Sequence, residues 1–185
     1  MGAAAAEDDR AIIFTYGTLK RGFSNHGIIQ EMILAGDAAF LGVSLTADRF
    51  PLVCGPYCVP FLIKLPGAGE RVLGELYAIS RRVLARVDEL EGVSRGHYER
   101  RPISAHLLIG GEGGGGGGDG AELLVEAEAY YANHSFGEEL WRKNGEKGFC
   151  SYSSEVAMGY VRRRDRPQDI TFLDQIRIFV SSAAD

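Results

Sequence analysis

One carboxylate in the sequence lies where a general acid or base could act. The segment "SRRVLARVDELEG" (80–92) predicts a helix with a serine cap and a terminating glycine. At about 100° per residue, Glu91 falls within about 20° of Leu84, on the apolar stripe of this helix. Burial and the negative pole of the helix would both raise the pKa of its carboxyl group toward the range of a general base. Two structural alternatives stay open: Glu91 points to solvent where the helix frays, or it pairs with an arginine such as Arg95.

The charges of this helix are arranged against its dipole. Arg81 and Arg82 lie in the first turn, whereas Asp88, Glu89 and Glu91 lie in the last. Cations favour the C-termini of helices and anions the N-termini. Each misplaced charge costs roughly a few tenths of a kcal/mol on an exposed surface, so this arrangement alone does not assign a function.

The stretch "TYGTLKRGFSNHG" (15–27) is the second candidate for chemistry. It follows the apolar run "AIIF" and leads into a predicted helix. It is therefore either an ordinary strand-to-helix connection or a loop whose backbone amides bind a substrate. Lys20 and Arg21 within it are expected to be solvated and without a role.

Other catalytic and ligand-binding centres have little support. The histidines are scattered without metal-ligand spacing, and Cys54 and Cys58 have no second pair, so we predict no metal site. No G-x-S-x-G element is present, and Cys150 has no identifiable partner as a nucleophile. The basic run "VRRRDR" (161–166) is interrupted by Asp165, and we favour a solvated loop over an anion site there.

Composition bounds the class of protein. The chain has 185 residues, 45% of them hydrophobic, and a net charge of −5, which fits one globular domain and argues against a nucleic-acid-binding surface. No apolar stretch reaches the roughly 20 residues of a transmembrane helix, and no secretory signal is evident. Three cysteines without repeated spacing are expected to stay reduced. We therefore predict a cytoplasmic protein without membrane or nucleic-acid partners, with a disordered leader at 1–10 and a single domain over 11–180.

The elements that must position these groups are mostly strands. Six short segments rich in β-branched or aromatic residues lie between turn signals, at 11–16, 38–46, 59–65, 71–79, 98–109 and 121–132. Besides the helix at 80–92, the segment 24–36 has apolar residues at helical spacing after a cap at Ser24 or Asn25. The glycine tract at 110–120 predicts a flexible hairpin loop rather than a phosphate-binding loop. Many strands and two helices in no regular alternation favour an α+β fold around a curved or barrel-like sheet.

Several motifs together resemble a known family. "YGTLKRGFSNH" (16–26), followed by "GELYAI" (74–79) and by "VDELEG" with "YERR" (87–101), is similar to the γ-glutamylcyclotransferase superfamily. The branch that the chain resembles most is γ-glutamylamine cyclotransferase with its plant avirulence-induced relatives, and "PFLIKLPGAGERVLGELY" (60–77) shares this likeness. The resemblance implies a small mixed β-barrel with peripheral helices and a pocket that needs no cofactor.

The resemblance also implies the site and its chemistry. Tyr16, Gly17, Thr18 and Leu19 match the substrate-binding loop, and Glu91 matches the catalytic acid/base. Family members cyclise a γ-glutamyl group to 5-oxoproline and release the attached amine. Because the α-amine of the substrate attacks its own γ-carbonyl, no protein nucleophile is needed. Glu91 would transfer the protons, and loop amides would stabilise the oxyanion. No residue that binds the α-carboxylate is evident.

Three functions stay open at this stage. The favoured one is a cyclotransferase acting on γ-glutamylamines such as γ-glutamyl-ε-lysine, with the small-molecule substrate as the expected partner. The second is the same chemistry on γ-glutamyl amino acids or glutathione. The third is a non-catalytic module of the same fold that binds γ-glutamyl compounds or acts in stress. The tail around Tyr152 and Tyr160 is a candidate for closing the pocket.

Overall fold

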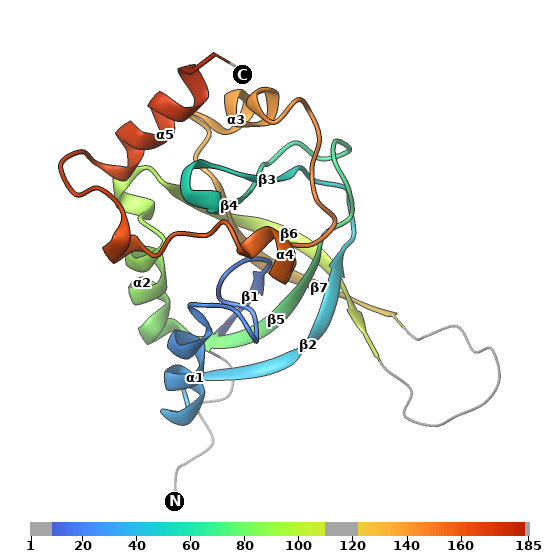
Figure 1. Cartoon of the computed structure of the whole chain (residues 1–185). Helices are drawn as coiled ribbons and strands as arrows, with labels where there is room; N and C mark the ends of the chain where they lie inside the picture. Colours follow the sequence, from blue (N-terminus) through green and yellow to red (C-terminus); the bar gives the residue numbers. More distant parts are fainter. Residues whose placement is uncertain (1–8, 110–121, 184–185) are drawn as a thin grey trace, which may run out of the picture.

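The strand-rich pattern of the sequence produces a closed barrel in the computed structural model, which describes residues 9–109 and 122–183. The barrel strands are Arg10–Thr15 (β1), Ala38–Thr46 (β2), Leu73–Ser80 (β5), Tyr98–Leu108 (β6) and Glu122–Ala132 (β7). Their order is β1, β5, β2, β6 and β7; neighbours pair antiparallel, and β7 returns to β1 in parallel (Figure 1). This mixed barrel with peripheral helices confirms the predicted α+β class.

A short hairpin extends the sheet beyond the barrel. β3 (Leu52–Cys54) pairs antiparallel with β4 (Pro60–Leu62), and β4 joins β7 in parallel through Leu62 and Tyr131. The sequence predicts a strand over 59–65 but none at β3. A strand of this length is too short for alternation to be recognised, so only its pairing with β4 defines it.

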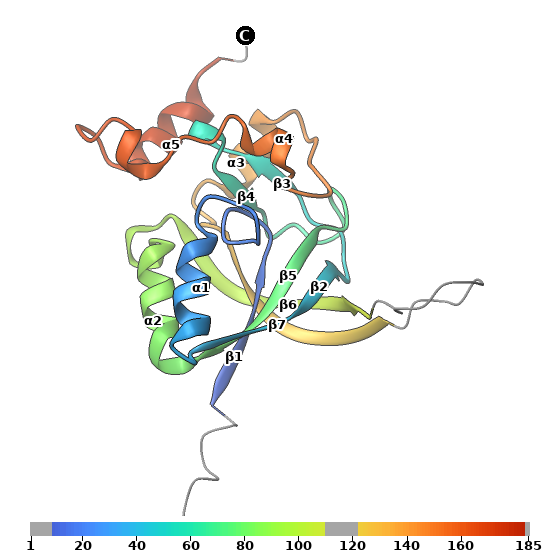
Figure 2. The same cartoon turned by 60° about the horizontal axis from the view of Figure 1, so that its bottom comes forward.

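The two predicted helices lie side by side against the barrel (Figure 2). α1 spans His26–Leu34, and α2 spans Arg81–Leu90, directly after β5. Leu84 and Val87 of α2 are buried in the same core cluster as Ile29 of α1. Both helices were predicted within a few residues, because an apolar stripe at helical spacing is a strong local signal.

Three further helices, which the sequence did not predict, lie in the last part of the described chain. They are α3 (Gly137–Lys143), α4 (Ser154–Ala157) and α5 (Phe172–Ser181), and Figure 1 shows α3 and α5 at the same end of the molecule. A local start signal exists for α5, since the Thr171 side chain accepts a hydrogen bond from the backbone N–H of Asp174. Its β-branched and aromatic residues, however, suit a strand equally well.

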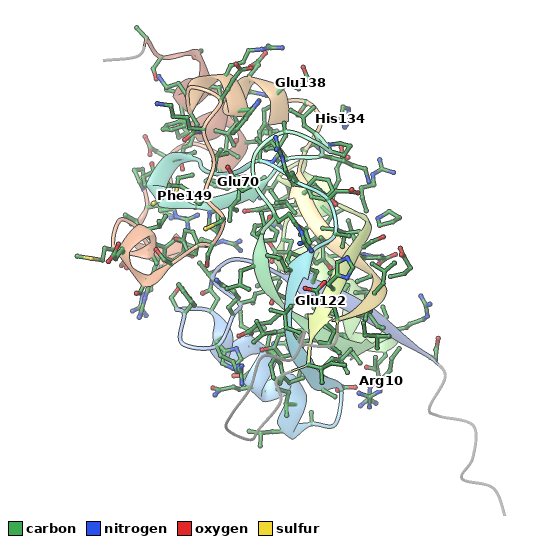
Figure 3. All side chains as sticks on the ribbon, turned by 90° about the vertical axis from the view of Figure 1, so that its right-hand side faces the viewer. Arg10, Glu70, Glu122, His134, Glu138 and Phe149 are labelled. Carbon is green, nitrogen blue, oxygen red and sulfur yellow. The ribbon has the colours of Figure 1, made fainter. Side chains whose placement is uncertain are left out.

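Apolar side chains fill the barrel and the space beneath the helices. One core cluster contains Phe14, Leu76 and Tyr131, which are almost fully buried. Figure 3 shows charged side chains such as Arg10 and Glu138 on the outside of this framework. Because the interior is mainly apolar, polar side chains that border a cavity are candidates for a functional role.

Some predictions fall outside the described residues. These are positions 1–8 of the predicted leader and the glycine tract at 110–120. Arg10, which the prediction assigned to the leader, is instead the first residue of β1. Within 9–109 and 122–183, no helix is long and apolar enough to cross a membrane. The same residues contain no group of three or more His, Cys, Asp or Glu side chains arranged to hold a metal ion.

Candidate active site

The turn after β1 and the end of α2 meet at one cavity of about 270 Å³. Loop 16–19 and Glu91 both border this cavity. The reason lies in the topology: β1 pairs with β5 along its whole length, and α2 follows β5 without a loop. Residues far apart in the sequence, which the sequence analysis singled out separately, therefore face a common space.

The backbone of loop 16–19 presents free hydrogen-bond donors. The carbonyl groups of Gly17 and Thr18 accept from the backbone N–H groups of Lys20 (3.1 Å) and Asn25 (3.0 Å). The N–H groups of Gly17, Thr18 and Leu19 have no protein acceptor within the described residues. Backbone donors removed from solvent are nearly always paired. Three consecutive free amides beside a cavity therefore offer a place for an oxygen atom of a ligand.

Gly17 is required by a close approach between the loop and the neighbouring strand. A Cβ atom at this position would lie 2.6 Å from Cγ of Pro60 at the start of β4. The sequence suggested that glycine lets the backbone approach a substrate. The structure adds a steric reason that is independent of any ligand.

The side chain of Tyr16 anchors the loop. Its hydroxyl donates to the carbonyl of Tyr130 at 2.5 Å and accepts from the N–H of Leu62 at 3.1 Å. Burial raises the pKa of this hydroxyl above its usual value. Because both bonds are to the backbone of neighbouring strands, Tyr16 has no polar side-chain atom to spare for a ligand, and its contribution to the cavity wall is its ring and backbone.

The prediction of two solvated bystanders is wrong for Lys20, whereas Arg21 is exposed as predicted but has a specific partner. Lys20 is buried, and its ammonium group donates to the carbonyl of Tyr152 at 2.9 Å. Arg21 donates through its backbone N–H (3.1 Å) and its Nε (3.2 Å) to the buried carboxylate of Glu75. The hydroxyl of Tyr77 donates to the same carboxylate at 2.7 Å. Glu75 on β5 thus holds the turn that follows loop 16–19. This role could not be predicted from the sequence, because strand pairing brings Glu75 to a turn 54 residues away.

Glu91 immediately follows α2 and borders the cavity. The residue is half-buried, and within the described residues its carboxylate has no hydrogen-bond or ion-pair partner. Removal from water raises the pKa of this carboxyl group to about 7, against an opposing effect of the Arg163 guanidinium. Arg95 instead donates to the carbonyl of Glu89 at 2.9 Å, so the predicted alternative of a Glu91–Arg95 pair is wrong. A carboxyl group with a pKa near neutrality can both accept and donate a proton.

Contacts at the last turn of α2 fix the position of Glu91. The Asp88 carboxylate accepts from Nε of Arg100 (2.8 Å) and from the hydroxyl of Tyr130 (2.6 Å), which ties α2 to β6 and β7. A guanidinium nitrogen of Arg163 donates to the carbonyl of Leu90 at 3.0 Å. This bond supplies a cation at the C-terminus of the helix, where the dipole favours one.

The arginines in the first turn of α2 also have partners elsewhere in the fold. Arg82 pairs with Asp37 at 2.7 Å, and Arg81 pairs with Asp9 at 2.8 Å. The arginine of the first pair holds the pKa of the Asp37 carboxyl group below its usual value. The two cations at the N-terminus of the helix therefore form ion pairs that the helix sequence alone does not reveal.

The C-terminal segment supplies four cavity residues: Tyr160, Arg163, Arg166 and Phe172. Among these, only Tyr160 was proposed from the sequence to border the pocket. The expectation of a solvated loop at 161–166 is wrong for Arg166, which is buried. Of the two tyrosines predicted to close the pocket, Tyr160 borders the cavity, whereas the fully buried Tyr152 is not among its lining residues. Closure by this tail stays a prediction.

His97 completes this side of the cavity. It is buried, and its ring meets the ring of Phe172 edge-on with centroids 5.1 Å apart. Burial, with the positive charges of Arg95 and Arg163 as further causes, lowers the pKa of His97 to about 4. The imidazole is therefore neutral at neutral pH, and Glu91 is the acidic residue of the cavity wall.

A family model described as "Gamma-glutamyl cyclotransferase, AIG2-like" matches residues 13–148 of the chain. The chain belongs to this family. The matched range includes loop 16–19 and Glu91 but ends before the C-terminal cavity residues.

Individual members of the family show how far the similarity extends. A protein of Arabidopsis thaliana, provisionally named a γ-glutamylcyclotransferase, is 56% identical over 177 residues and 94% of each chain. The γ-glutamylaminecyclotransferase of Rattus norvegicus is 40% identical over 66% of this chain and 80% of its own length. The crystal structure of an AIG2-like protein from Mus musculus superposes with a TM-score of 0.67 at 30% identity, covering 85% of this chain and 99% of that one.

Proposed function

We propose that the protein converts a γ-glutamylamine, such as γ-glutamyl-ε-lysine, to 5-oxoproline and the free amine. One observation carries this proposal: a half-buried carboxyl group with a raised pKa, that of Glu91, borders the same cavity as three free backbone amides. The family gives the reaction class, and the name of the rat relative supports an amine as the leaving group.

The proposed reaction is an intramolecular acyl transfer. The α-amine of the substrate attacks its γ-carbonyl carbon, and Glu91 accepts a proton from that amine. The carbonyl oxygen becomes an oxyanion that accepts hydrogen bonds from the N–H groups of Gly17, Thr18 and Leu19. The tetrahedral intermediate then expels the leaving amine as the C–N bond breaks, and Glu91 returns the proton to that nitrogen. The pKa near 7 suits a group that must act first as base and then as acid.

Positioning accounts for the rest of the proposed catalysis. Ring closure needs the γ-glutamyl chain folded so that amine and carbonyl meet, and an enclosed cavity restricts the extended conformers. Since nucleophile and electrophile belong to the same molecule, the protein contributes a shape, a proton carrier and an oxyanion site. The cavity wall combines aromatic and apolar side chains, which give the shape, with a few charged and polar groups.

The test is release of lysine and 5-oxoproline from γ-glutamyl-ε-lysine by the wild type and two variants. Glu91→Gln keeps the shape but removes the proton carrier, so we expect kcat to fall by about 10² to 10⁴. Glu89→Gln is the matched control, because Glu89 lies at the same helix end but is exposed; its activity should equal that of the wild type.

A substrate panel separates this proposal from its competitors. Turnover of γ-glutamyl amino acids or glutathione with no turnover of γ-glutamylamines would assign the same chemistry to another leaving group. If no γ-glutamyl compound is turned over but both wild type and Glu91→Gln bind one, the protein is a binding module and the proposed function is wrong.

A further inference from the structure

The C-terminal segment that borders the cavity is held by hydrogen bonds to the elements beside it. The Tyr160 hydroxyl accepts from Nδ2 of Asn25 at 3.3 Å, and Asn25 also donates to Thr18 in the loop. The N–H of Val161 donates to the carbonyl of Tyr57 at 3.1 Å. These bonds connect the segment to the substrate loop on one side and to the turn before β4 on the other.

Arg166 is the part of this segment that is best enclosed. Three aromatic rings surround its guanidinium, those of Phe172 (5.1 Å), Tyr160 (5.4 Å) and Tyr57 (5.5 Å). The side chain is only 9% exposed. Rings at this distance attract the cation and hold the guanidinium plane in place. Arg166 is therefore a positioned group rather than a mobile surface arginine.

The donors of Arg166 are only partly used by the protein. Its Nε donates to the carbonyl of Val161 at 2.8 Å, and the Tyr160 hydroxyl is a neighbour. A guanidinium has five N–H donors in a planar fork. Within the described residues no carboxylate forms an ion pair with Arg166, and burial lowers its pKa below the usual value. A buried cation without a counter-ion is unfavourable, so an arginine kept in this state beside a cavity points to an anionic ligand.

Arg166 and Glu91 both border the cavity, and so does the buried Tyr98. Burial raises the pKa of the Tyr98 hydroxyl; the charge of Glu91 raises it further, whereas that of Arg166 opposes the rise. Arg163 adds a second cation on this side, since it bonds to Leu90, the residue before Glu91. In a γ-glutamyl compound the α-amine and the α-carboxylate share one carbon atom, so a group that acts on the amine must have the carboxylate within a few ångströms.

We propose that Arg166 binds the α-carboxylate of the γ-glutamyl group and so directs the α-amine toward Glu91. This assignment rests on the proposed function for the identity of the substrate. The planar fork of a guanidinium matches a carboxylate with two parallel hydrogen bonds, which fixes orientation as well as affinity. Arg166 lies beyond the range 13–148 of the family match, so this contact is not one that the match itself supplies.

Binding of two small lactams tests the assignment without requiring turnover. 5-Oxoproline retains the carboxylate in question, and 2-pyrrolidinone is the same ring without it. Calorimetry should show that Arg166→Gln weakens 5-oxoproline binding at least about tenfold, as loss of a charged hydrogen bond predicts, and leaves 2-pyrrolidinone binding unchanged. Arg164→Gln, an exposed neighbour outside the cavity, should bind both as the wild type does. Arg166→Lys should recover part of the loss, because the charge remains but the fork does not.

The outcomes that overturn the assignment are distinct. Equal 5-oxoproline affinity in wild type and folded Arg166→Gln, or no binding by the wild type at millimolar concentration, rejects it. Equal loss for both lactams, or a lowered melting temperature in both Arg166 variants with no selective loss, assigns Arg166 a structural role only.

A pair of substrates distinguishes the two carboxylates that could reach Arg166. γ-Glutamyl-ε-lysine has a carboxylate on the leaving amine, whereas γ-glutamyl-n-butylamine has none. Equal losses of kcat/KM in Arg166→Gln for both substrates support the α-carboxylate. A loss confined to the lysine compound places the leaving group at Arg166 and overturns the proposal. If the wild type turns over neither compound, the proposed function fails, while the lactam comparison still decides the role of Arg166.

Discussion

The two walls of the cavity are built in different ways. The inner wall, formed by loop 16–19 and the end of α2, belongs to the barrel and to the range matched by the family model. The outer wall, formed by residues 160–172, is an irregular segment that follows this range and is held by single hydrogen bonds and aromatic contacts. The inner wall holds the proposed proton carrier and oxyanion site. The outer wall holds Arg166, which forms no ion pair within residues 9–109 and 122–183. The proposed proton transfer therefore takes place on the barrel, whereas the proposed substrate anchor lies on an irregular segment outside the barrel.

Among the changes that compare the two walls, the largest effect is expected from damaging the inner wall at Gly17. Gly17→Ala would place Cβ 2.6 Å from Cγ of Pro60 and push the loop away from β4. We expect activity to fall by about 10²-fold because the amides move, with about 1–3 kcal/mol lost in the free energy of unfolding from overpacking. Steady-state kinetics and urea denaturation measure the two effects.

A control variant and a second substitution test whether the clash with Pro60 causes the loss. Gly27→Ala introduces a methyl group where nothing lies within 4 Å, so activity should be retained. Adding Pro60→Ala to Gly17→Ala removes the clashing atom and should restore part of the activity. Full activity in Gly17→Ala alone would show that the loop tolerates displacement. Activity would then not depend on the exact position of the loop amides.

A second effect, on stability, arises from the half-buried carboxyl group of Glu91 in the inner wall. The pKa of Glu91 rises from 4.5 to about 7 on folding, so both states are protonated below pH 4.5 and only the unfolded state ionises between these values. The wild type should therefore lose up to about 3 kcal/mol relative to Glu91→Gln as the pH rises from 4.5 to above 7. Denaturant unfolding of both proteins at pH 4.5 and pH 8 measures the difference. A pH-independent difference would mean that Glu91 is solvated like an ordinary surface glutamate.

The two walls are coupled electrostatically through Arg163. Its guanidinium lowers the pKa of Glu91, so Arg163→Gln should raise that pKa. Because the base form of Glu91 is needed for the first proton transfer, the acidic limb of the kcat/KM profile should move to higher pH. Arg164→Gln serves as the control of equal charge, since Arg164 is exposed and pairs only weakly with Asp165 at 3.9 Å. If the acidic limb of the kcat/KM profile stays at the same pH in Arg163→Gln, Arg163 has no electrostatic effect on Glu91 and the two walls are not coupled in this way.

The smallest effect is expected at the hydrogen bond that fastens the outer wall. Tyr160→Phe removes the acceptor of a 3.3 Å bond from Asn25 but keeps the ring beside Arg166. A bond of this length is weak, and Asn25 retains its 2.9 Å bond to Thr18. We expect kcat/KM to fall by less than about fivefold, which corresponds to roughly 1 kcal/mol. A much larger loss would mean that the hydroxyl contacts the substrate.

The contrast between the walls also explains what the sequence could predict. Helix α2 and the position of Glu91 on its apolar stripe follow from periodicity, and β2 was predicted with the boundaries it has. These features are local, so neighbouring residues determine them. Lys20, Glu75 and Arg166 were missed or misplaced because each contacts a partner far along the chain, Tyr152, Arg21 and Tyr57 respectively. The basic run at 161–166 was visible as a pattern, but its burial depends on rings contributed by Tyr57 and Phe172.

The closure of the barrel has a consequence for the order of folding. β1 and β7 pair in parallel, and the Tyr16 hydroxyl reaches the Tyr130 carbonyl across a sequence separation of 114 residues. Contacts between such distant segments carry the largest loop-closure entropy and form late, whereas the hairpin of β6 and β7 and the helices are more local. The substrate loop begins where β1 ends, so it acquires its shape only when this closure is complete. Catalytic competence should therefore be the last property regained on refolding, after most of the secondary structure has returned.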